Sequence, residues 1–62
     1  MQPADFKHHR RHTLRLTQSQ LAAELDVSRA TIGKLERGYL VPIVYQRALE
    51  GLMWRQVAAA LN

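Results

Sequence analysis

The segment from Thr17 to Gly38, TQSQLAAELDVSRATIGKLERG, constrains the fold of this chain more than any other stretch. Thr17 precedes Gln20 by three residues, the spacing of a capping box in which each side chain satisfies a free backbone N–H of the other. Ser28 is a second favourable N-cap. The segment therefore predicts two short helices, whose inward faces carry Leu21, Ala22 and Leu25 in the first and Ile32 and Leu35 in the second.

These two helices are joined by a tight turn at Asp26 and Val27. Asp26 takes the position at which a helix ends in the left-handed conformation, where Gly is easiest and Asn or Asp is tolerated. Val27 is expected to pack into the core. Helices this short are not stable alone, so they need each other and a third helix. Together they form a helix-turn-helix unit, in which the second helix is built to enter a DNA major groove.

A first helix is expected over about residues 4–13, because Pro3 suits the first turn of a helix and Asp5 suits its N-terminal dipole. Residues 1–3 are expected to be frayed. The helix is poorly amphipathic, since Phe6 is its only large apolar residue.

The chain after Pro42 is apolar at helical spacing. Pro42 is expected to open a helix at its first position, and Gly51, which costs about 1 kcal/mol against Ala, is a candidate for a bend. The stretch has more apolar surface than a monomer of this size readily covers, which is typical of an association site. We expect a symmetric dimer through about residues 42–62, built on Leu49, Leu52, Met53, Trp54, Val57 and Leu61. The alternative is that the last helix folds back onto its own core.

Length and charge set the class of protein. The 62 residues predict a single domain, 1–62, near the lower limit for unaided folding, and the absence of Cys excludes disulfides and thiolate metal sites. The net charge is +4, and residues 1–40 hold seven of the nine Lys and Arg. A basic front and a nearly neutral, apolar back predict one side that faces a polyanion and one that faces protein. No apolar run reaches the length of a membrane span, and a cytoplasmic location is expected.

The outward face of the second motif helix carries the predicted DNA contacts. Arg29 is the best candidate for reading a base, since Arg pairs bidentately with guanine. Gly33 is expected to let the helix backbone approach the groove floor. Thr17 and Gln18 are placed to bind phosphate at the start of the first motif helix. The full predicted set is Thr17, Gln18, Ser28, Arg29, Ala30, Thr31, Gly33, Lys34, Arg37 and Tyr39.

His8 and His12 lie four residues apart, a spacing at which both side chains can face one metal ion. Two histidines with no third ligand nearby recur by chance, so no metal site and no cofactor are predicted. No nucleophile and base stand in a recognisable arrangement, which argues against an enzyme. At 62 residues, neither an effector domain nor a small-molecule ligand is expected.

Residues 16–38, LTQSQLAAELDVSRATIGKLERG, resemble the Cro/CI-type (XRE-like) helix-turn-helix family. The resemblance implies an all-α, lambda-repressor-like fold of four to five short helices. It implies that Gln18 contacts the DNA backbone and that an Arg of the first helix pairs with Glu36. Whether that Arg is Arg10 or Arg11 stays open, because the segment before Leu14 is one residue longer than usual. The residues that it places toward the groove are Arg29, Ala30, Thr31 and Lys34.

The sequence departs from the family at Asp26, which replaces the usual turn Gly, and at His9, which takes the place of a second large apolar residue in the first helix. Beyond residue 42, PIVYQRALEGL is more weakly similar to small phage-type regulators, including anti-CRISPR-associated repressors. Those proteins bind inverted repeats as dimers and repress their own operon. The leading hypothesis is a dimeric, sequence-specific DNA-binding repressor. An antitoxin-like protein-interaction module with secondary DNA or RNA binding is the alternative.

Overall fold

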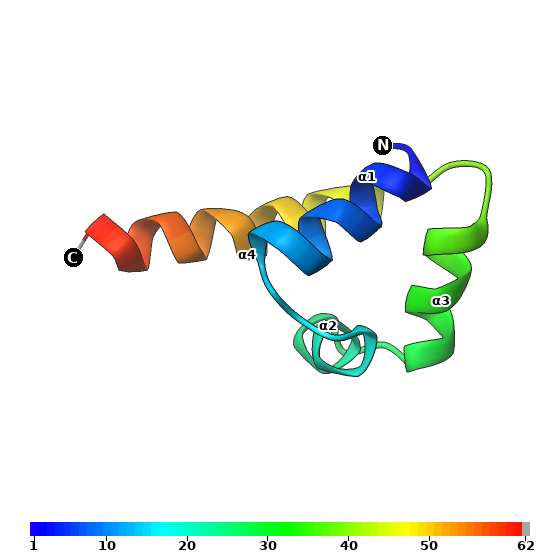
Figure 1. Ribbon diagram of the computed structural model, residues 1–62, viewed down its shortest axis with the longest axis horizontal. Helices are drawn as coiled ribbons and strands as arrows, with labels where there is room; N and C mark the ends of the chain where they lie inside the picture. The colour runs from blue at the N-terminus through cyan, green and yellow to red at the C-terminus, as the bar shows by residue number, and fades with distance from the viewer. Residues whose placement is uncertain (62) are drawn as a thin grey trace.

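The computed structural model describes residues 1–61, and these residues form helices and no strand. The helices are α1 (Pro3–His8), which continues into the π-helical turn η1 (His9–Thr13), then α2 (Gln18–Leu25), α3 (Arg29–Arg37) and α4 (Ile43–Leu61). In Figure 1, α2 and α3 lie below α1, while α4 runs across the view and extends beyond the other helices. The predicted all-α class is confirmed, but α4 has 19 residues and is not short.

The first helical segment spans residues 3–13, close to the expected 4–13, and its second part is a π turn that the sequence does not reveal. After His8 the backbone widens into the π turn η1, where the Leu14 N–H donates to the His9 carbonyl, five residues back. A π turn holds one residue more than an α turn, so it takes up the extra residue of this segment. The chain then reverses at Arg15, which has a left-handed φ of 56°.

The two motif helices begin and end as predicted. The capping box at Thr17 is complete, because its hydroxyl accepts from the Gln20 N–H and its own N–H donates to the Gln20 side chain. Asp26 ends α2 in the left-handed conformation, with φ 57° and ψ 46°. Ser28 caps α3 by accepting from the Thr31 N–H at 3.2 Å. These local hydrogen bonds satisfy backbone donors that a short helix otherwise leaves open.

The core lies where α1, α2 and α3 meet the first half of α4. Its largest fully buried side chains come from all four α-helices and from the connection before α4, which makes these elements a single packing unit. The inward positions predicted for the motif helices are confirmed, with Leu25 half-buried at the edge beside Val27. The buried apolar residues are Phe6, Leu14, Leu21, Ala22, Ile32, Leu35, Val41, Leu49 and Leu52.

The expectation that residues 1–3 are frayed is wrong. The Met1 ammonium donates to Gln46 Oε1 at 2.8 Å, and the Met1 carbonyl accepts from the Val41 N–H at 3.0 Å. The Met1 side chain also packs against the core. The start of the chain is therefore tied to α4 and to the connection before it by bonds between residues far apart in sequence.

The helix α4 is continuous through Gly51, so the predicted bend is not found. Leu49 and Leu52 are its buried side chains, and from Trp54 onward every described residue is exposed. This second half projects from the body, which gives the molecule a long dimension of 36 Å against 20 and 19 Å (Figure 1). Within residues 1–61, no helix has the length and apolar character needed to cross a membrane.

Candidate nucleic-acid interface

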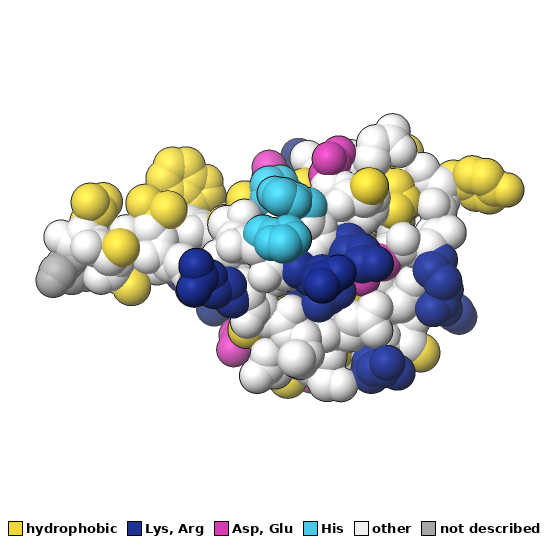
Figure 2. All heavy atoms as spheres, viewed as in Figure 1, with side chains coloured by type: hydrophobic (Ala, Val, Ile, Leu, Met, Phe, Trp, Pro, Cys, Tyr) yellow, Lys and Arg dark blue, Asp and Glu magenta, His cyan; other side chains and the backbone are white. Residues whose placement is uncertain are grey.

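The outward face of α3 presents the predicted cationic side chains to solvent. Arg29, Lys34 and Arg37 are exposed, and Ala30 lies exposed next to Arg29. Thr31 is half-buried, and its hydroxyl lies 3.0 Å from that of Ser28, so the helix cap holds it. Figure 2 shows Lys and Arg side chains spread over the viewed face, some next to the histidines and others on the side of the molecule where α3 lies. This face can bind a polyanion, as the charge distribution predicts.

Gly33 of α3 is buried. A Cβ at this position would lie 3.3 Å from Nη1 of Arg37, four residues further along the helix. The Arg37 guanidinium therefore lies over the gap that the missing side chain leaves. In this structure the exposed side chain of Arg37 covers Gly33, and the close approach of Gly33 to a groove floor stays a prediction.

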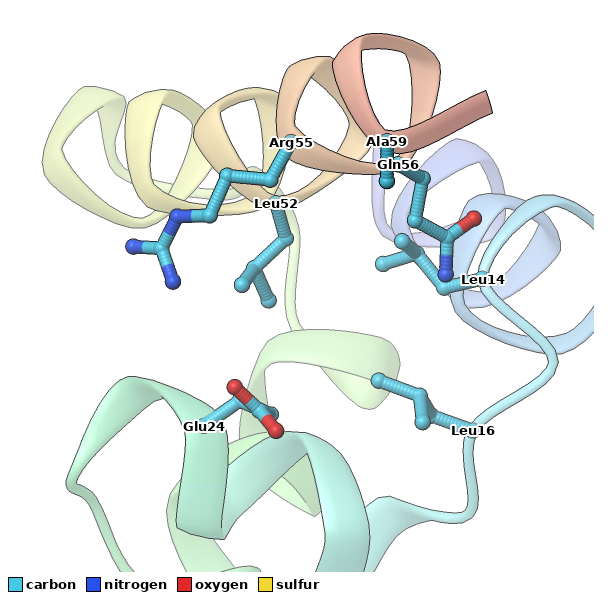
Figure 3. A pocket seen from close by; sticks show the side chains of 7 residues that line it. All are labelled: Leu14, Leu16, Glu24, Leu52, Arg55, Gln56 and Ala59. Carbon is cyan, nitrogen blue, oxygen red and sulfur yellow. The ribbon is translucent and has the colours of Figure 1, made fainter. Parts of the chain in front are cut away.

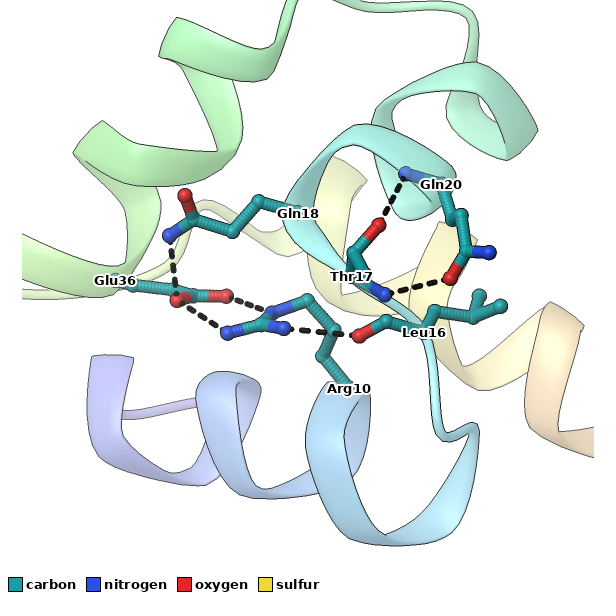
Figure 4. Close-up of polar contacts among 6 residues, drawn as sticks. All are labelled: Arg10, Leu16, Thr17, Gln18, Gln20 and Glu36. Carbon is teal, nitrogen blue, oxygen red and sulfur yellow. Dashed lines mark hydrogen bonds and ion pairs between the residues drawn. The ribbon is translucent and has the colours of Figure 1, made fainter.

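Three side chains from three helices form a hydrogen-bonded cluster behind this face (Figure 4). Arg10 donates from Nε to Glu36 Oε2 at 2.6 Å and from Nη2 to Glu36 Oε1 at 3.1 Å. Gln18 Nε2 donates to the same Oε1 at 3.0 Å. The side chains of Arg10 and Glu36 are 8% and 4% exposed, so the pair is almost fully removed from water.

This arrangement answers the question that the sequence left open, since Arg10 is the partner of Glu36. Arg10 is also the second buried side chain of the first helical segment, whereas His9, expected in that place, is half-buried. A third donor, Arg10 Nη1, bonds the Leu16 carbonyl at 2.9 Å. The bidentate geometry links the first helical segment to α3 and is typical of strong Arg–carboxylate pairs.

The cluster also fixes the charge state of Glu36. Burial of the carboxyl disfavours its charged form and raises its pKa, but the hydrogen bonds from Arg10 and Gln18 and the charge of Arg10 outweigh that effect. The pKa of Glu36 is therefore held below its ordinary value of 4.5. The carboxylate stays ionised and keeps η1, α2 and α3 in one arrangement.

At the start of α2, Thr17 is exposed and Gln18 is half-buried. The Thr17 N–H and hydroxyl are both engaged in the capping box. Gln18 gives one N–H to Glu36, and an amide carries two, so its second N–H is left for another acceptor. Tyr39, beyond the end of α3, is fully exposed. The structure thus brings the predicted phosphate contacts to the surface, with Gln18 held in place by Glu36.

The predicted dimer residues divide into two groups. Leu49 and Leu52 are 0% and 7% exposed and belong to the protomer core, so they are corrected from interface to core residues. Their burial follows from position, because the body covers this half of α4. Met53 packs partly against the core. Trp54, Val57 and Leu61 are 72%, 47% and 82% exposed on the projecting half.

A groove of about 250 Å³ lies between α4 and the segment that leads into α2, on a face of α4 that does not include Trp54, Val57 or Leu61. Leu14, Leu16 and Leu52 point into it (Figure 3). Glu24 of α2 and Arg55 of α4 lie at one end. The groove therefore adds apolar area on this other face of α4, which sequence periodicity alone does not reveal.

The histidines gather on one side of the first helical segment. The ring centroids of His8 and His12 are 4.8 Å apart, and His9 Nδ1 lies 3.3 Å from the Thr13 hydroxyl. Among residues 1–61, no three His, Cys, Asp or Glu side chains are placed to hold a metal ion. The cyan group in Figure 2 lies beside the basic side chains, so these imidazoles border the cationic face.

Comparison with known proteins agrees with this geometry. The family model described as helix-turn-helix, HTH_3, matches residues 9–42, which is 34 of the 62 residues and includes α2, α3 and the Arg10–Glu36 pair. No curated protein and no solved structure matches the chain. The match extends beyond the two motif helices to the η1 turn that precedes them and the connection that follows. The chain belongs to the Cro/CI-type (XRE) helix-turn-helix family of DNA-binding regulators.

Proposed function

We propose that this chain is a homodimeric repressor that binds an inverted repeat in a promoter and blocks the promoter by occupying it. The observation that carries the proposal is the position of Trp54, 72% exposed on a helix that projects away from the cationic face of α3. A DNA-reading surface and an apolar surface thus occupy different parts of one small domain. The weaker likeness to anti-CRISPR-associated repressors supports an autorepressor of a phage-type operon.

The exposed side chains of α4 support a second copy as the partner. A single Trp contributes about 150–250 Å² of contact area, Val57 and Leu61 enlarge the same patch, and a shallow groove of about 350 Å³ borders Trp54 and Val57. In a two-fold interface the same patch of each protomer contacts that of its partner, so the total buried area is twice the area that one protomer buries. The interface of a stable dimer buries about 1,200–2,000 Å² in total.

Dimerisation through α4 suits the reading of a palindrome. Two copies of α3 would enter successive major grooves on one face of the duplex, about 34 Å apart. Arg29 would read a base in each half-site, and the cations around it would neutralise phosphates. The proposal therefore predicts an operator with two-fold symmetry.

Selection of bound sites from random duplex DNA tests the proposed function directly. The expected result is enrichment of an inverted repeat whose half-site centres are separated by about one helical turn. No enrichment at moderate salt would overturn the proposal. Enrichment of a single, asymmetric site would contradict the dimer while leaving the DNA-binding assignment in place.

Two valines of α4 provide a matched test of the interface. Val57 lies on the projecting half and Val44 near the start of the helix, and both are exposed, at 47% and 65%. Val57→Asp should dissociate the dimer in sedimentation velocity at tens of micromolar, whereas Val44→Asp should leave it intact. A wild-type protein that sediments as a monomer at this concentration would contradict the proposal.

The alternative, an antitoxin-like module, uses the same exposed half of α4 to bind a different protein. Purification from the native host separates the two functions. A stoichiometric second chain that Val57→Asp releases would favour the alternative, and a homodimer without such a chain would favour the repressor.

A further inference from the structure

A hollow lined with cations lies where η1 ends and α2 begins. It is bordered by Arg11, His12, Arg15 and Thr17, with Arg10 and Leu16 completing its wall. We call this hollow the basic basin. No acidic side chain borders it. Of the residues that border the basin, Thr17 is a predicted phosphate contact, whereas Arg15 is not among the DNA contacts predicted from the sequence.

The backbone of the turn holds the basin in place. The Leu16 N–H donates to the Arg10 carbonyl at 2.9 Å, and Arg10 Nη1 donates back to the Leu16 carbonyl at 2.9 Å. Arg15, between them, sits in the left-handed region at φ 56°, which a non-glycine residue adopts at an energetic cost. The Leu14 N–H bonds the His9 carbonyl on the other side of Arg15, so backbone bonds flank the strained residue. Residues held in strained backbone conformations cluster at functional sites.

The charge of the basin is available to a ligand. Arg10 forms an ion pair with Glu36. Arg11 and Arg15 are exposed, and neither makes an ion pair among the residues that the structure describes. Guanidinium groups bind phosphate oxygens through parallel N–H donors. The hydroxyl-bearing Thr17 at the rim adds a polar group next to them. This combination fits a phosphate.

The position of the basin identifies the source of that phosphate. It adjoins the start of α2, and the first helix of a helix-turn-helix crosses the DNA backbone when the second lies in the major groove. The Arg10–Glu36 pair and the Gln18–Glu36 bond connect the basin wall directly to α3. The basin therefore has a fixed position relative to the recognition helix.

We propose that the basic basin binds a DNA backbone phosphate at the edge of each half-site, with Arg15 as its main donor. The inference rests on the proposed DNA-binding function and adds to it a site formed by the π turn and the left-handed residue that follows. A phosphate contact carries no base information, so the basin contributes affinity and register and leaves sequence preference unchanged.

Arg15→Gly is the most informative variant, because it separates folding from binding. Gly adopts a positive φ without strain, so the variant should melt at a higher temperature than the wild type. It should nevertheless bind DNA about fivefold to tenfold more weakly, on the selected operator and on a scrambled duplex alike. The slope of log K against log salt should become shallower by about 1 per protomer. Arg15→Lys should keep most of the salt slope.

Arg47→Gln is the matched control, since Arg47 is an exposed cation of α4 outside the basin. Fluorescence anisotropy from 50 to 300 mM salt gives affinity and slope for each variant. If Arg15→Gly binds no more weakly than Arg47→Gln and with an equal slope, the basin proposal is wrong, although the DNA-binding function stands because the wild type still binds. If the wild type binds no selected duplex, the proposed function itself fails.

Discussion

Arg10 and Glu36 stand 26 residues apart in sequence and meet with Nε and Oε2 at 2.6 Å, both side chains almost fully buried. The pair joins the turn η1 to the last part of α3. Because the pair also holds Gln18, one carboxylate sets how the start of α2, the η1 turn and the recognition helix lie relative to one another. The geometry of the DNA-facing surface thus depends on a contact behind it.

Removing the carboxylate should destabilise the fold. Glu36→Ala leaves the Arg10 charge buried without a partner, a change that costs about 3–5 kcal/mol. The exposed carboxylate of Glu24 is the control, and Glu24→Ala should change the free energy of unfolding by less than about 0.5 kcal/mol. Urea denaturation followed by circular dichroism measures both. Equal changes in the free energy of unfolding for the two substitutions would show that the buried pair does not contribute to stability.

Acid should destabilise the protein through the same residue. The pKa of Glu36 is lower in the folded state than in the unfolded chain, so its stabilisation is complete above about pH 4.5 and is lost as the pH falls through the folded value. The free energy of unfolding should therefore decrease below about pH 4.5. In Glu36→Gln this decrease should be smaller, as measured by urea denaturation between pH 3 and 7. An unchanged pH profile in Glu36→Gln would contradict the prediction.

Asp26 should be replaceable with a gain in stability. It holds a left-handed conformation at φ 57°, which Gly adopts without strain. Asp26→Gly is expected to raise the free energy of unfolding by up to about 1 kcal/mol. Asp26→Asn, which also tolerates this conformation, should stay near the wild type. A lower melting temperature for Asp26→Gly would mean that the carboxylate itself contributes to the turn.

Two other glycines should respond in opposite directions to alanine. A Cβ at Gly51 would meet no atom within 4 Å, so Gly51→Ala should stabilise α4 by about 1 kcal/mol. A Cβ at Gly38 would lie 3.1 Å from the Lys34 carbonyl, a backbone atom that cannot easily move, so Gly38→Ala should lower stability. Thermal denaturation of the two variants checks the contrast.

Substitutions of two α3 residues should distinguish a contact that reads a base from a contact that binds phosphate. Arg29→Ala is expected to cost about 1–3 kcal/mol of binding free energy and to relax the preference at one base position of the operator. Arg37→Ala should weaken binding to all sequences alike and make the salt dependence shallower. Competition assays with an operator and its single-base variants measure both effects. A uniform loss for Arg29→Ala would remove its assignment to a base.

The sequence predicted the elements whose causes are local. The caps at Thr17 and Ser28 and the left-handed Asp26 depend on residues a few positions away, so spacing alone located them. The π turn was beyond such reasoning, because its bond from the Leu14 N–H to the His9 carbonyl has no cap residue or apolar spacing that marks it in the sequence. The extra residue before Leu14 left open which Arg pairs with Glu36, and the bonds of Arg10 to Glu36 resolve that choice.

Other features that the sequence did not reveal have similar physical origins. Met1 is held by Gln46, 45 residues away, a contact that no local pattern encodes. Gly33 is covered because the long Arg37 side chain bends back along its own helix. In α4 the apolar residues cover more than one face of the helix, and the structure of the body decides that Leu52, on the face toward the core, is buried while Trp54, on the opposite face, is exposed.

The unbroken α4 has a consequence for how such a regulator can change its operator. Since one helix extends from the body to the exposed end, each residue inserted beyond the core would advance that end by about 1.5 Å and turn it by about 100°. In the proposed dimer, the phase between the two recognition helices would be encoded in the length of α4, separately from the side chains that read bases. The spacing of the proposed half-sites would then evolve by insertion or deletion in one exposed helix while base preference stays the same.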